Sequence, residues 1–406
     1  MSYVLCLVSN LQSQIENAMQ NTPSIPRTLY NEEHLLFFKT VADFAAKEIT
    51  PNNEQWEKDH MVSRESWQRL GENGFLCMQV DEKYGGLGIK DFRYNAIFTE
   101  VLALTGCAGP AVGYPLHSDI VCPYIDHYGN EATKQKYLPK MVTGEYIAAI
   151  AMTEPGAGSD LQGMRTTAVD KGDHYLVNGS KTFITNGYLC DLAVVAVKTD
   201  PTKGAKGISL LVMDANAEGF SKGKPFHKAG LHAQDTCELF FDNVKVPKEN
   251  LLGSEGHGFA YLMTELAQER LVVGLGAIAA AEATLNLTIQ YIKERQAFGK
   301  PVAEFQNTKY KIAEMATEVE MGRVFADRCV ELHNNKQLDG ATASMAKYSL
   351  TELQCKVADA CVQLHGGYGY IWEYQVARAW ADARVQRIYA GTNEIMKELI
   401  SRKYLQ

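Results

Sequence analysis

The most constraining feature of this sequence is the stretch from Gly256 to Gly299, which has the pattern of one long helix with a misplaced acid. Alternating steps of four and three residues pick out one stripe of apolar and small residues that contains a carboxylate: Leu262, Leu266, Glu269, Val273, Gly276 and Ala280. An acid in such a stripe either faces something buried or lies at a helix edge and pairs with a neighbour, here Arg270. The pattern predicts a buried Glu269, and the surface pair stays open as the alternative.

Small residues continue this stripe, because Gly274, Gly276 and Ala277 follow the acid. They leave room for a flat or long group to lie close to the helix backbone. A carboxylate beside such a slot loses contact with water, which tends to raise its pKa and makes it a better base near neutral pH. We therefore take Glu269 as the candidate catalytic base.

Composition excludes several classes of protein. The 406 residues are 46% hydrophobic and 22% charged, which is typical of a globular protein with two or three domains. The net charge of -8, without a run rich in Lys and Arg, argues against nucleic acid as a partner. Nine cysteines are typical here of reduced thiols in a reducing compartment, and we expect no metal site.

The first residues do not resemble a targeting signal. Residues 1–27 contain a short apolar run with no basic residue before it, and the first arginine is Arg27, so we expect neither a secretory signal nor a mitochondrial transit peptide. No run approaches the roughly 18 apolar residues of a membrane span. We expect a variable extension and a cytoplasmic location in a bacterium, with the mitochondrial matrix as the less favoured alternative.

Three blocks follow this extension. Residues 28–147 show helical periodicity, residues 148–253 show short β-branched runs separated by turn residues, and residues 254–406 return to long amphipathic helices. We expect an α+β multidomain fold. Its parts are a helical N-terminal domain, a mostly antiparallel β-barrel or sandwich, and a C-terminal four-helix bundle.

Five strings at the joints between these blocks can carry chemistry. AMTEPGAGSD offers glycines and hydroxyls, and NGSKTFITN places Phe183 and Thr185 on one face of a strand. ERQAFGK offers Arg295 and Phe298 to a pyrophosphate and a ring, QLHGGYGY lets backbone approach a ligand, and IYAGTNEI can cap a helix that begins near Glu394. Each string alone is also an ordinary turn, strand or helix end. None is the G-x-G-x-x-G of a Rossmann nucleotide site.

The joint order of these strings is much more specific than any one of them. Together with TCELFFDNVKVP they resemble the acyl-CoA dehydrogenase family of flavoproteins over nearly all of residues 31–405, and ASMAKY and HGGYGYIWEY look most like its long-chain branch. The resemblance implies a homotetramer with one non-covalent FAD per chain. The flavin-binding positions that it implies are Met152, Thr153, Ser159, Phe183, Thr185, Arg295, Phe298, Gln306, Gln363, Leu364, His365, Gly366, Gly367, Thr392, Asn393 and Glu394.

The resemblance also implies which groups meet the substrate. Ser159, Arg270 and Gly391 match substrate contacts, and the backbone amide of Ala390 matches a donor to the thioester oxygen. Many members carry the base where this chain has Ala390, whereas the long-chain and isovaleryl branches carry it at the position of Glu269. The resemblance therefore selects the same acid as the helical stripe.

The implied activity is FAD-dependent α,β-dehydrogenation of an acyl-CoA to the trans-2-enoyl-CoA in fatty-acid β-oxidation, with electron-transfer flavoprotein as the acceptor. The matching branch implies long or branched acyl chains, and the small Ala111, Gly113 and Pro115 match a helix that lines the acyl cavity. Two alternatives stay open. One is a desaturase or oxidase of a carrier-protein-bound thioester on this scaffold, and the other is a non-catalytic binding module, which the retained base and arginines disfavour.

Overall fold

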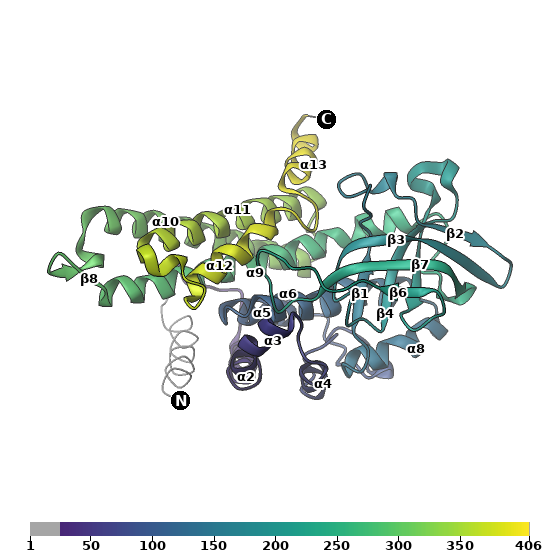
Figure 1. Ribbon diagram of the computed structural model, residues 1–406, viewed down its shortest axis with the longest axis horizontal. Coiled ribbons are helices and arrows are strands. Elements are labelled where there is room, and N and C mark those ends of the chain that lie inside the picture. The colour runs from purple at the N-terminus through teal and green to yellow at the C-terminus, as the bar shows by residue number, and fades with distance from the viewer. Residues whose placement is uncertain (1–24, 406) are drawn as a thin grey trace.

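The structure is a computed structural model that describes residues 25–405, and these form three regions (Figure 1). Most of the expected N-terminal extension lies outside the described residues. The first region is helical, as expected. Its elements are α2 (Glu32–Phe44), η1 (Ala45–Ile49), η2 (Thr50–Asn52), α3 (Asn53–Asp59), α4 (Arg64–Glu72), η3 (Glu82–Tyr84), α5 (Arg93–Leu104), α6 (Ala108–Pro115), η4 (Leu116–Val121), α7 (Cys122–Tyr128) and α8 (Glu131–Val142).

The middle region is one seven-stranded sheet in the order β1-β4-β2-β3-β7-β6, with β5 paired to β4. Its pairs are antiparallel except where β1 and β2 meet β4, so the expectation of a mostly antiparallel domain is confirmed. The strands are β1 (Ala148–Ala151), β2 (Thr167–Asp170), β3 (His174–Thr185), β4 (Leu192–Lys198), β5 (Ile208–Asp214), β6 (Phe220–Lys222) and β7 (Thr236–Pro247). Short 3-10 turns lie between them at η5 (Leu161–Gly163) and η6 (Pro201–Gly207), and after them at η7 (Lys248–Asn250).

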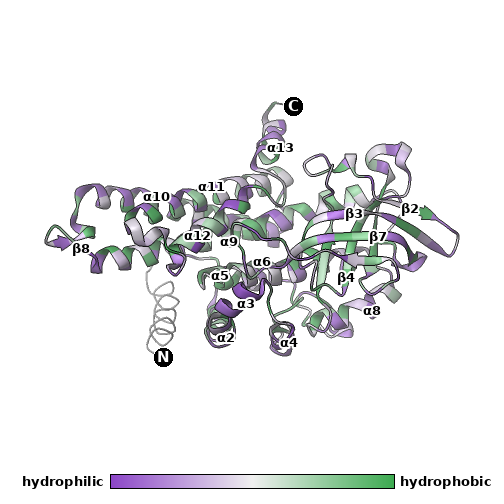
Figure 2. Cartoon of the chain, viewed as in Figure 1, coloured by the Kyte–Doolittle hydropathy of each residue, from purple (hydrophilic) through white to green (hydrophobic). Residues whose placement is uncertain are grey.

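Strand β4 is hydrophobic on both faces because it separates two cores (Figure 2). Val194 and Ala196 pack into the core that contains the N-terminal helices, whereas Ala193 and Val195 pack into the interior of the sheet domain. Alternate residues of a strand point to opposite faces, so a continuous apolar run is required here. The sheet is thereby fixed against the first region.

The third region is a helical bundle built around α9 (Gly258–Glu294), which packs against α5, α10 and α11. The fourth position is filled by the short α12, which contacts α9 and α11. The other elements are β8 (Gln296–Ala297), β9 (Lys300–Pro301), η8 (Val302–Glu304), α10 (Gln306–Asn334), α11 (Gly340–His365), η9 (Gly366–Tyr370), α12 (Gln375–Ala383), η10 (Arg384–Arg387) and α13 (Asn393–Leu405).

Helix α9 is buried outside the one stripe that its sequence predicts, and within that stripe Leu262, Leu266 and Glu269 are buried whereas Val273, Gly276 and Ala280 are half-buried. Glu265, Arg270 and Val272 are buried as well as Glu269, because α5, α7, α10 and α11 surround the helix. Among the described residues α9 is the one helix long and apolar enough to cross a membrane, and 56% of its most apolar window is buried inside the molecule.

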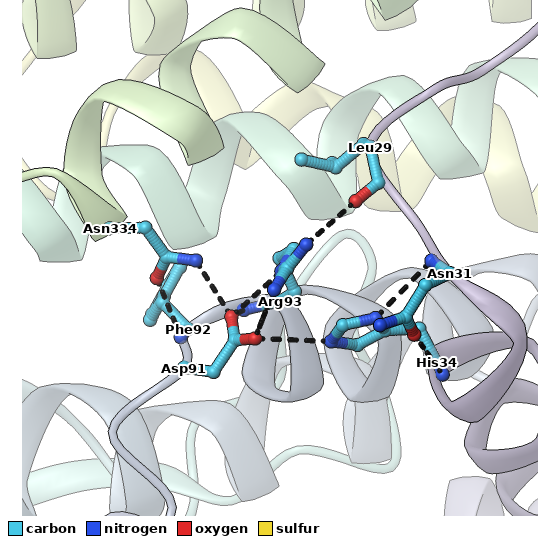
Figure 3. A network of polar contacts seen from close by, with 7 residues as sticks. All are labelled: Leu29, Asn31, His34, Asp91, Phe92, Arg93 and Asn334. Carbon is cyan, nitrogen blue, oxygen red and sulfur yellow. Dashed lines mark hydrogen bonds and ion pairs between the residues drawn. The ribbon is translucent and has the colours of Figure 1, made fainter.

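A polar network joins the N-terminal region to the end of α10 (Figure 3). The carboxylate of Asp91 accepts from Arg93 Nε at 2.9 Å and from Asn334 Nδ2 at 2.6 Å, and it lies 3.2 Å from His34 Nε2. Asn334 Oδ1 in turn accepts from the amide of Phe92 at 2.7 Å. The start of α5 and the end of α10 are thus held together by directional bonds.

Candidate active site

Glu269 lies within α9 and is 4% exposed. The hydroxyl of the fully buried Tyr124 donates to Glu269 Oε1 at 2.6 Å, and no ion pair joins Glu269 to Arg270 within the described chain. Burial raises the pKa of Glu269 to about 7, the Tyr124 hydrogen bond lowers it, and the charge of Glu265 raises it further. The surface-pair interpretation is therefore wrong, and the carboxylate has the pKa of an effective base at neutral pH.

Tyr124 is held against α9 by an irregular turn. The π-helical turn η4 precedes α7, whose second residue is Pro123. Proline has no N–H, so Pro123 cannot donate to the carbonyl of Asp119 four residues earlier. The side chain of Gln268 donates to that carbonyl instead, at 2.6 Å. Because Gln268 precedes Glu269, this bond fixes α7 beside the candidate base.

A second acid, Glu265, lies one helical turn before Glu269 and is 6% exposed. Its Oε1 accepts from Tyr128 OH at 2.8 Å and lies 2.9 Å from His127 Nδ1. The stripe analysis predicted one acid on the buried face of this helix, and the structure shows two. The difference arises because α7 covers a part of α9 outside the stripe.

Arg270 is 7% exposed and has few partners. Its Nη1 donates to Ser344 Oγ of α11 at 3.4 Å, and its Nε is buried without a hydrogen-bond partner. Burial lowers its pKa. A buried guanidinium without a carboxylate partner is costly, so a polar ligand group that reached it would relieve that cost. This agrees with the substrate contact expected at Arg270.

The loop before α13 has two consecutive residues in the left-handed region, Ala390 with φ 52° and Gly391 with φ 89°. A non-glycine residue there is strained by about 1–3 kcal/mol, so the surrounding structure must hold it. The buried Lys347 of α11 donates from Nζ to the carbonyl of Gly391 at 2.8 Å and to Asn393 Oδ1 at 2.9 Å. Burial lowers the pKa of Lys347 to about 8. We find no hydrogen bond from the Ala390 amide within residues 25–405.

Helix α13 begins where the IYAGTNEI string predicts. Thr392 Oγ1 accepts from the amide of Ile395 at 3.3 Å, and the helix starts at Asn393. The side chain of Asn393 is buried and bonded to Lys347, so it faces the protein interior. Only its backbone is then left for the cofactor contact expected at Asn393, which stays a prediction, whereas Glu394 is exposed.

The AMTEPGAGSD loop is anchored to β3 by a buried ion pair. Lys181 is fully buried and donates from Nζ to Glu154 Oε1 at 2.7 Å and to the carbonyl of Met152 at 3.0 Å. The amide of Thr182 donates to the carbonyl of Thr153 at 2.9 Å. Met152 and Thr153 are half-buried, and the loop then leads to an exposed Ser159.

Phe183 and Thr185 flank the buried Ile184 near the end of β3. Phe183 is 67% exposed and has φ 59°, and the β3–β7 register shifts between Lys181 and Ile184. The strand therefore bulges at this ring instead of continuing the regular alternation that we expected. A bulge re-aims a side chain, which here leaves a large aromatic ring exposed.

The ERQAFGK and QLHGGYGY strings meet in one surface cavity of about 600 Å³. Arg295 lines it from the end of α9, and residues 363–367 line it from the end of α11. A Cβ on Gly366 or Gly367 would meet no atom within 4 Å, so packing does not require glycine at either position, although the backbone of Gly366, with φ 62°, does. Beside the cavity, Phe298 is 97% exposed and Gln306 is exposed at the start of α10.

Apart from Thr392 and Glu394 at the start of α13, the expected flavin contacts of one chain therefore form two separate groups. One lies on the β-domain, at the N-terminal end of α9, and the other lies beside β8, at the far end of the bundle (Figure 1). A helix of 37 residues is about 55 Å long. The base, Arg270 and the Ala390 loop lie between these groups. Ser344 of α11 contacts Arg270. Lys347, three residues later on α11, donates to the carbonyl of Gly391.

Two of the small residues singled out in the sequence serve packing instead of a cavity. A Cβ on Gly113 would lie 2.6 Å from Gln234 Oε1, so glycine is needed where α6 meets the β-domain. A Cβ on Gly274 would lie 3.2 Å from Leu350 of α11. Gly276 is more open, with its nearest neighbour, in Thr99, at 3.8 Å.

The sequence analysis missed several residues that shape this site: Tyr124, His127, Tyr128, Lys181 and Lys347. The tyrosines and the acids each have a spacing of four residues, which predicts one helix face for each pair. The spacing does not indicate that the two faces meet. The buried lysines have no sequence signal, because burial of Lys is rare and depends on tertiary partners.

Comparison with known proteins gives matches along the whole described chain. Three family models match: acyl-CoA dehydrogenase N-terminal domain over residues 31–145, middle domain over 149–244 and C-terminal domain over 256–405. The chain is 48% identical over 402 residues to the long-chain specific acyl-CoA dehydrogenase, mitochondrial, of Rattus norvegicus, which covers 98% of this chain and 93% of the relative.

Solved structures with the same fold include an acyl-CoA dehydrogenase from Geobacillus kaustophilus, with a TM-score of 0.91 and 54% identity over 93% of this chain and 99% of that one. A glutaryl-CoA dehydrogenase from Mycobacterium smegmatis in complex with FADH2 has a TM-score of 0.87 and 28% identity over 93% of this chain and 95% of that one.

Proposed function

The chain belongs to the acyl-CoA dehydrogenase family, and from that premise we propose that Glu269 removes the α proton of its acyl-CoA substrate. As a member, it is an FAD-dependent oxidoreductase of acyl-CoA thioesters, which confirms the family and activity expected from the sequence. The observation that carries the role of Glu269 is its burial between α7 and α9 with a pKa of about 7. Such a carboxylate is ionised in part at neutral pH and is protected from water.

The α hydrogen of a thioester is weakly acidic, so the carbonyl oxygen must be stabilised as it gains charge. We assign this role to the amide of Ala390, in a loop that Lys347 holds through the Gly391 carbonyl. One such bond in a dry site contributes about 3 kcal/mol. Glu269 takes the proton from Cα, and FAD, when bound, accepts the β hydrogen as hydride. Arg270, buried without a carboxylate partner, binds a polar part of the substrate.

The residues present fit FAD. Phe183 and Phe298 are large exposed rings, and Gly366 and Gly367 leave the backbone open to a ligand beside Arg295. We propose that Met152, Thr153, Ser159, Phe183 and Thr185 hold the flavin ring. We assign the nucleotide half to Arg295, Phe298, Gln306 and residues 363–367, and a further flavin contact to Thr392 and Glu394 beside the Ala390 loop.

We infer that these two groups of contacts come from different subunits, because they lie at opposite ends of α9 and the helix is longer than the cofactor can bridge. A homotetramer with shared cofactor sites accounts for this arrangement. Sedimentation of an active, FAD-loaded monomer would contradict it.

We propose long or branched acyl-CoAs as substrates, electron-transfer flavoprotein as the acceptor and the cytoplasm as the location. The long-chain specificity named for the rat relative supports the substrate class. Anaerobic bleaching of the flavin by a ladder of acyl-CoAs tests it, and we expect the fastest bleaching with long or branched chains. Stoichiometric peroxide, or turnover of a carrier-bound thioester, would favour the oxidase or desaturase alternative instead.

The base is tested by Glu269→Gln, because glutamine keeps the shape of the side chain and cannot accept the proton. We expect the variant to bind FAD and acyl-CoA and to lose at least about 10²–10⁴-fold in the rate of flavin bleaching. Glu33→Gln, an exposed acid on α2, is the control and should bleach as the wild type does. Near wild-type bleaching by Glu269→Gln would place the base elsewhere.

A further inference from the structure

Helices α7 and α9 face each other with a row of titratable side chains. Tyr124, His127 and Tyr128 lie on one face of α7, and Glu265 and Glu269 lie one turn apart on α9. Tyr124 OH donates to Glu269 at 2.6 Å, whereas Tyr128 OH donates to Glu265 at 2.8 Å. The ring nitrogen Nδ1 of His127 lies 2.9 Å from the same oxygen of Glu265.

The exposure of these groups rises along the row. Glu269 is 4% exposed and Glu265 is 6% exposed, whereas the side chain of His127 is 51% exposed. Two hydrogen-bonded groups therefore lie one helical turn apart, Tyr124 with Glu269 and Tyr128 and His127 with Glu265, and the second group reaches solvent at His127. Both groups lie on the side of α9 covered by α7.

The proposed function, on which this inference rests, leaves a proton on Glu269 in every turnover. Helix α7 covers one side of this carboxylate through Tyr124, so product bound against its other side would separate it from water there. The nearest other acceptor along α9 is the carboxylate of Glu265, since Cβ atoms four residues apart in a helix lie about 5–6 Å from each other. The pKa of Glu269 already responds to the charge of Glu265.

We propose that Glu265 and His127 form a relay that carries the proton of Glu269 to solvent. The protonated Glu269 loses its O–H proton to the carboxylate of Glu265. Glu265 then passes a proton across the 2.9 Å contact to Nδ1 of neutral His127, and the imidazolium releases one from Nε2 to water. Proton exchange of the exposed imidazole with water then returns it to the tautomer whose Nδ1 can accept again. Both carboxyl groups return to the charged form, and Tyr124 and Tyr128 hold them in place.

The charges around His127 suit this role. The hydrogen bond to Glu265 raises the pKa of His127 more than burial lowers it, Asp126 beside it on α7 raises it further, and Lys90 lowers it. The raised pKa makes neutral imidazole a stronger proton acceptor, and release of the proton from the imidazolium becomes easier as the pH rises. Because half of the side chain is in water, its substitution should not disturb the fold.

The relay is tested by His127→Gln in the FAD-loaded enzyme. Three quantities are measured: anaerobic flavin bleaching in the first turnover, steady-state turnover with an artificial electron acceptor, and proton release to an indicator dye in weak buffer. We expect first-turnover bleaching to be unchanged, and turnover and proton release to slow by up to about 10²-fold. Added imidazole should restore both turnover and proton release. It would not do so if the substitution had only damaged the structure.

His174→Gln is the matched control, because His174 also pairs with a carboxylate, that of Asp173 at 2.7 Å, but lies on β3. It should behave as the wild type with and without imidazole. Glu265→Gln should slow proton release in the same way, and imidazole should not restore it, since the break then lies before His127.

Two results would overturn the relay alone. One is a His127→Gln enzyme that turns over and releases protons as fast as the wild type, and the other is a slowed variant on which imidazole has no effect. A wild-type enzyme whose flavin no acyl-CoA bleaches would overturn the proposed function, and the relay with it.

Discussion

At the scale of single residues, the property that suits Glu269 to act as a base also costs stability. Its pKa rises from the ordinary 4.5 to about 7 because burial disfavours the charged form. The folded protein therefore binds this proton more tightly than the unfolded chain does. The folded state loses stability as the pH rises from about 4.5 to 7, and above that window the charged carboxylate carries the full cost.

Glu269→Gln should therefore stabilise the enzyme above pH 7 while it abolishes activity. A pKa shift of this size corresponds to at most roughly 3–4 kcal/mol, at about 1.4 kcal/mol per unit. The gain should be largest at pH 8 and shrink towards pH 5. Denaturant unfolding of both proteins, each loaded with FAD, at the two pH values measures it. If the unfolding free energy of the variant at pH 8 were equal to or lower than that of the wild type, burial would not be the cause of the raised Glu269 pKa.

At the scale of elements, α9 is where the three regions meet, and its sequence predicts some of its features well. The long apolar periodicity and the acid within it predict a buried helix and a buried Glu269, because both are local properties of one segment. The pairing with α7 is not local. It depends on Pro123, which frees a carbonyl for Gln268, and on the close approach of two helices that the sequence separates by more than a hundred residues.

The same limit applies to the rest of the site. The cap at Thr392 was predicted because capping involves neighbours in sequence. The contact of buried Lys347 with the Gly391 carbonyl was not predicted, because it depends on α11 packing against the loop before α13. The bulge that exposes Phe183 was not predicted either, because it depends on the register of β3 with β7. Three-dimensional packing decides these features.

Two glycines of α9 distinguish the effect of close packing on stability from the effect of helix propensity. A Cβ on Gly258 would lie 2.7 Å from the backbone of Ser209 in β5, whereas one on Gly276 would find its nearest neighbour at 3.8 Å. Gly258→Ala should shift the start of α9 and destabilise the protein by about 1–3 kcal/mol. Gly276→Ala is the control and should be neutral or stabilise by up to about 1 kcal/mol. Thermal unfolding of the two variants should rank them in this order, and the reverse order would contradict it.

At the scale of the whole molecule, a buried ion network holds the N-terminal region to the bundle. Glu100 of α5 is 1% exposed, and its carboxylate oxygens lie 2.9 Å from Arg27 and 2.9 Å from Arg323 of α10. Arg323 also binds Glu282 of α9, with Nε 2.7 Å from Oε1. Together with the Asp91 network of Figure 3, these bonds fix α5 and α10 around the helix that carries the base.

Arg323→Met should therefore cost far more than the loss of a surface ion pair. The substitution leaves Glu100 buried with one cationic partner fewer, and breaking a buried pair in this way costs about 3–5 kcal/mol. Arg328→Met is the control on the same helix. Its pair with Glu331 spans 2.7 Å but is largely exposed, so its loss should cost no more than about 1 kcal/mol. Denaturant unfolding at pH 7 measures both.

The pH dependence of this difference identifies its origin. Burial acts to raise the pKa of Glu100, but the charges of Arg27 and Arg323 outweigh it and hold the pKa below its ordinary 4.5. A carboxylate with a lowered pKa stabilises the fold above the ordinary value, and that contribution is lost as the pH falls through the lowered one. The gap in unfolding free energy between the wild type and Arg323→Met should therefore be largest at neutral pH and narrow below about pH 4.5. A gap that stayed constant down to pH 3.5 would mean that Arg323 acts through packing of its side chain and not through its charge.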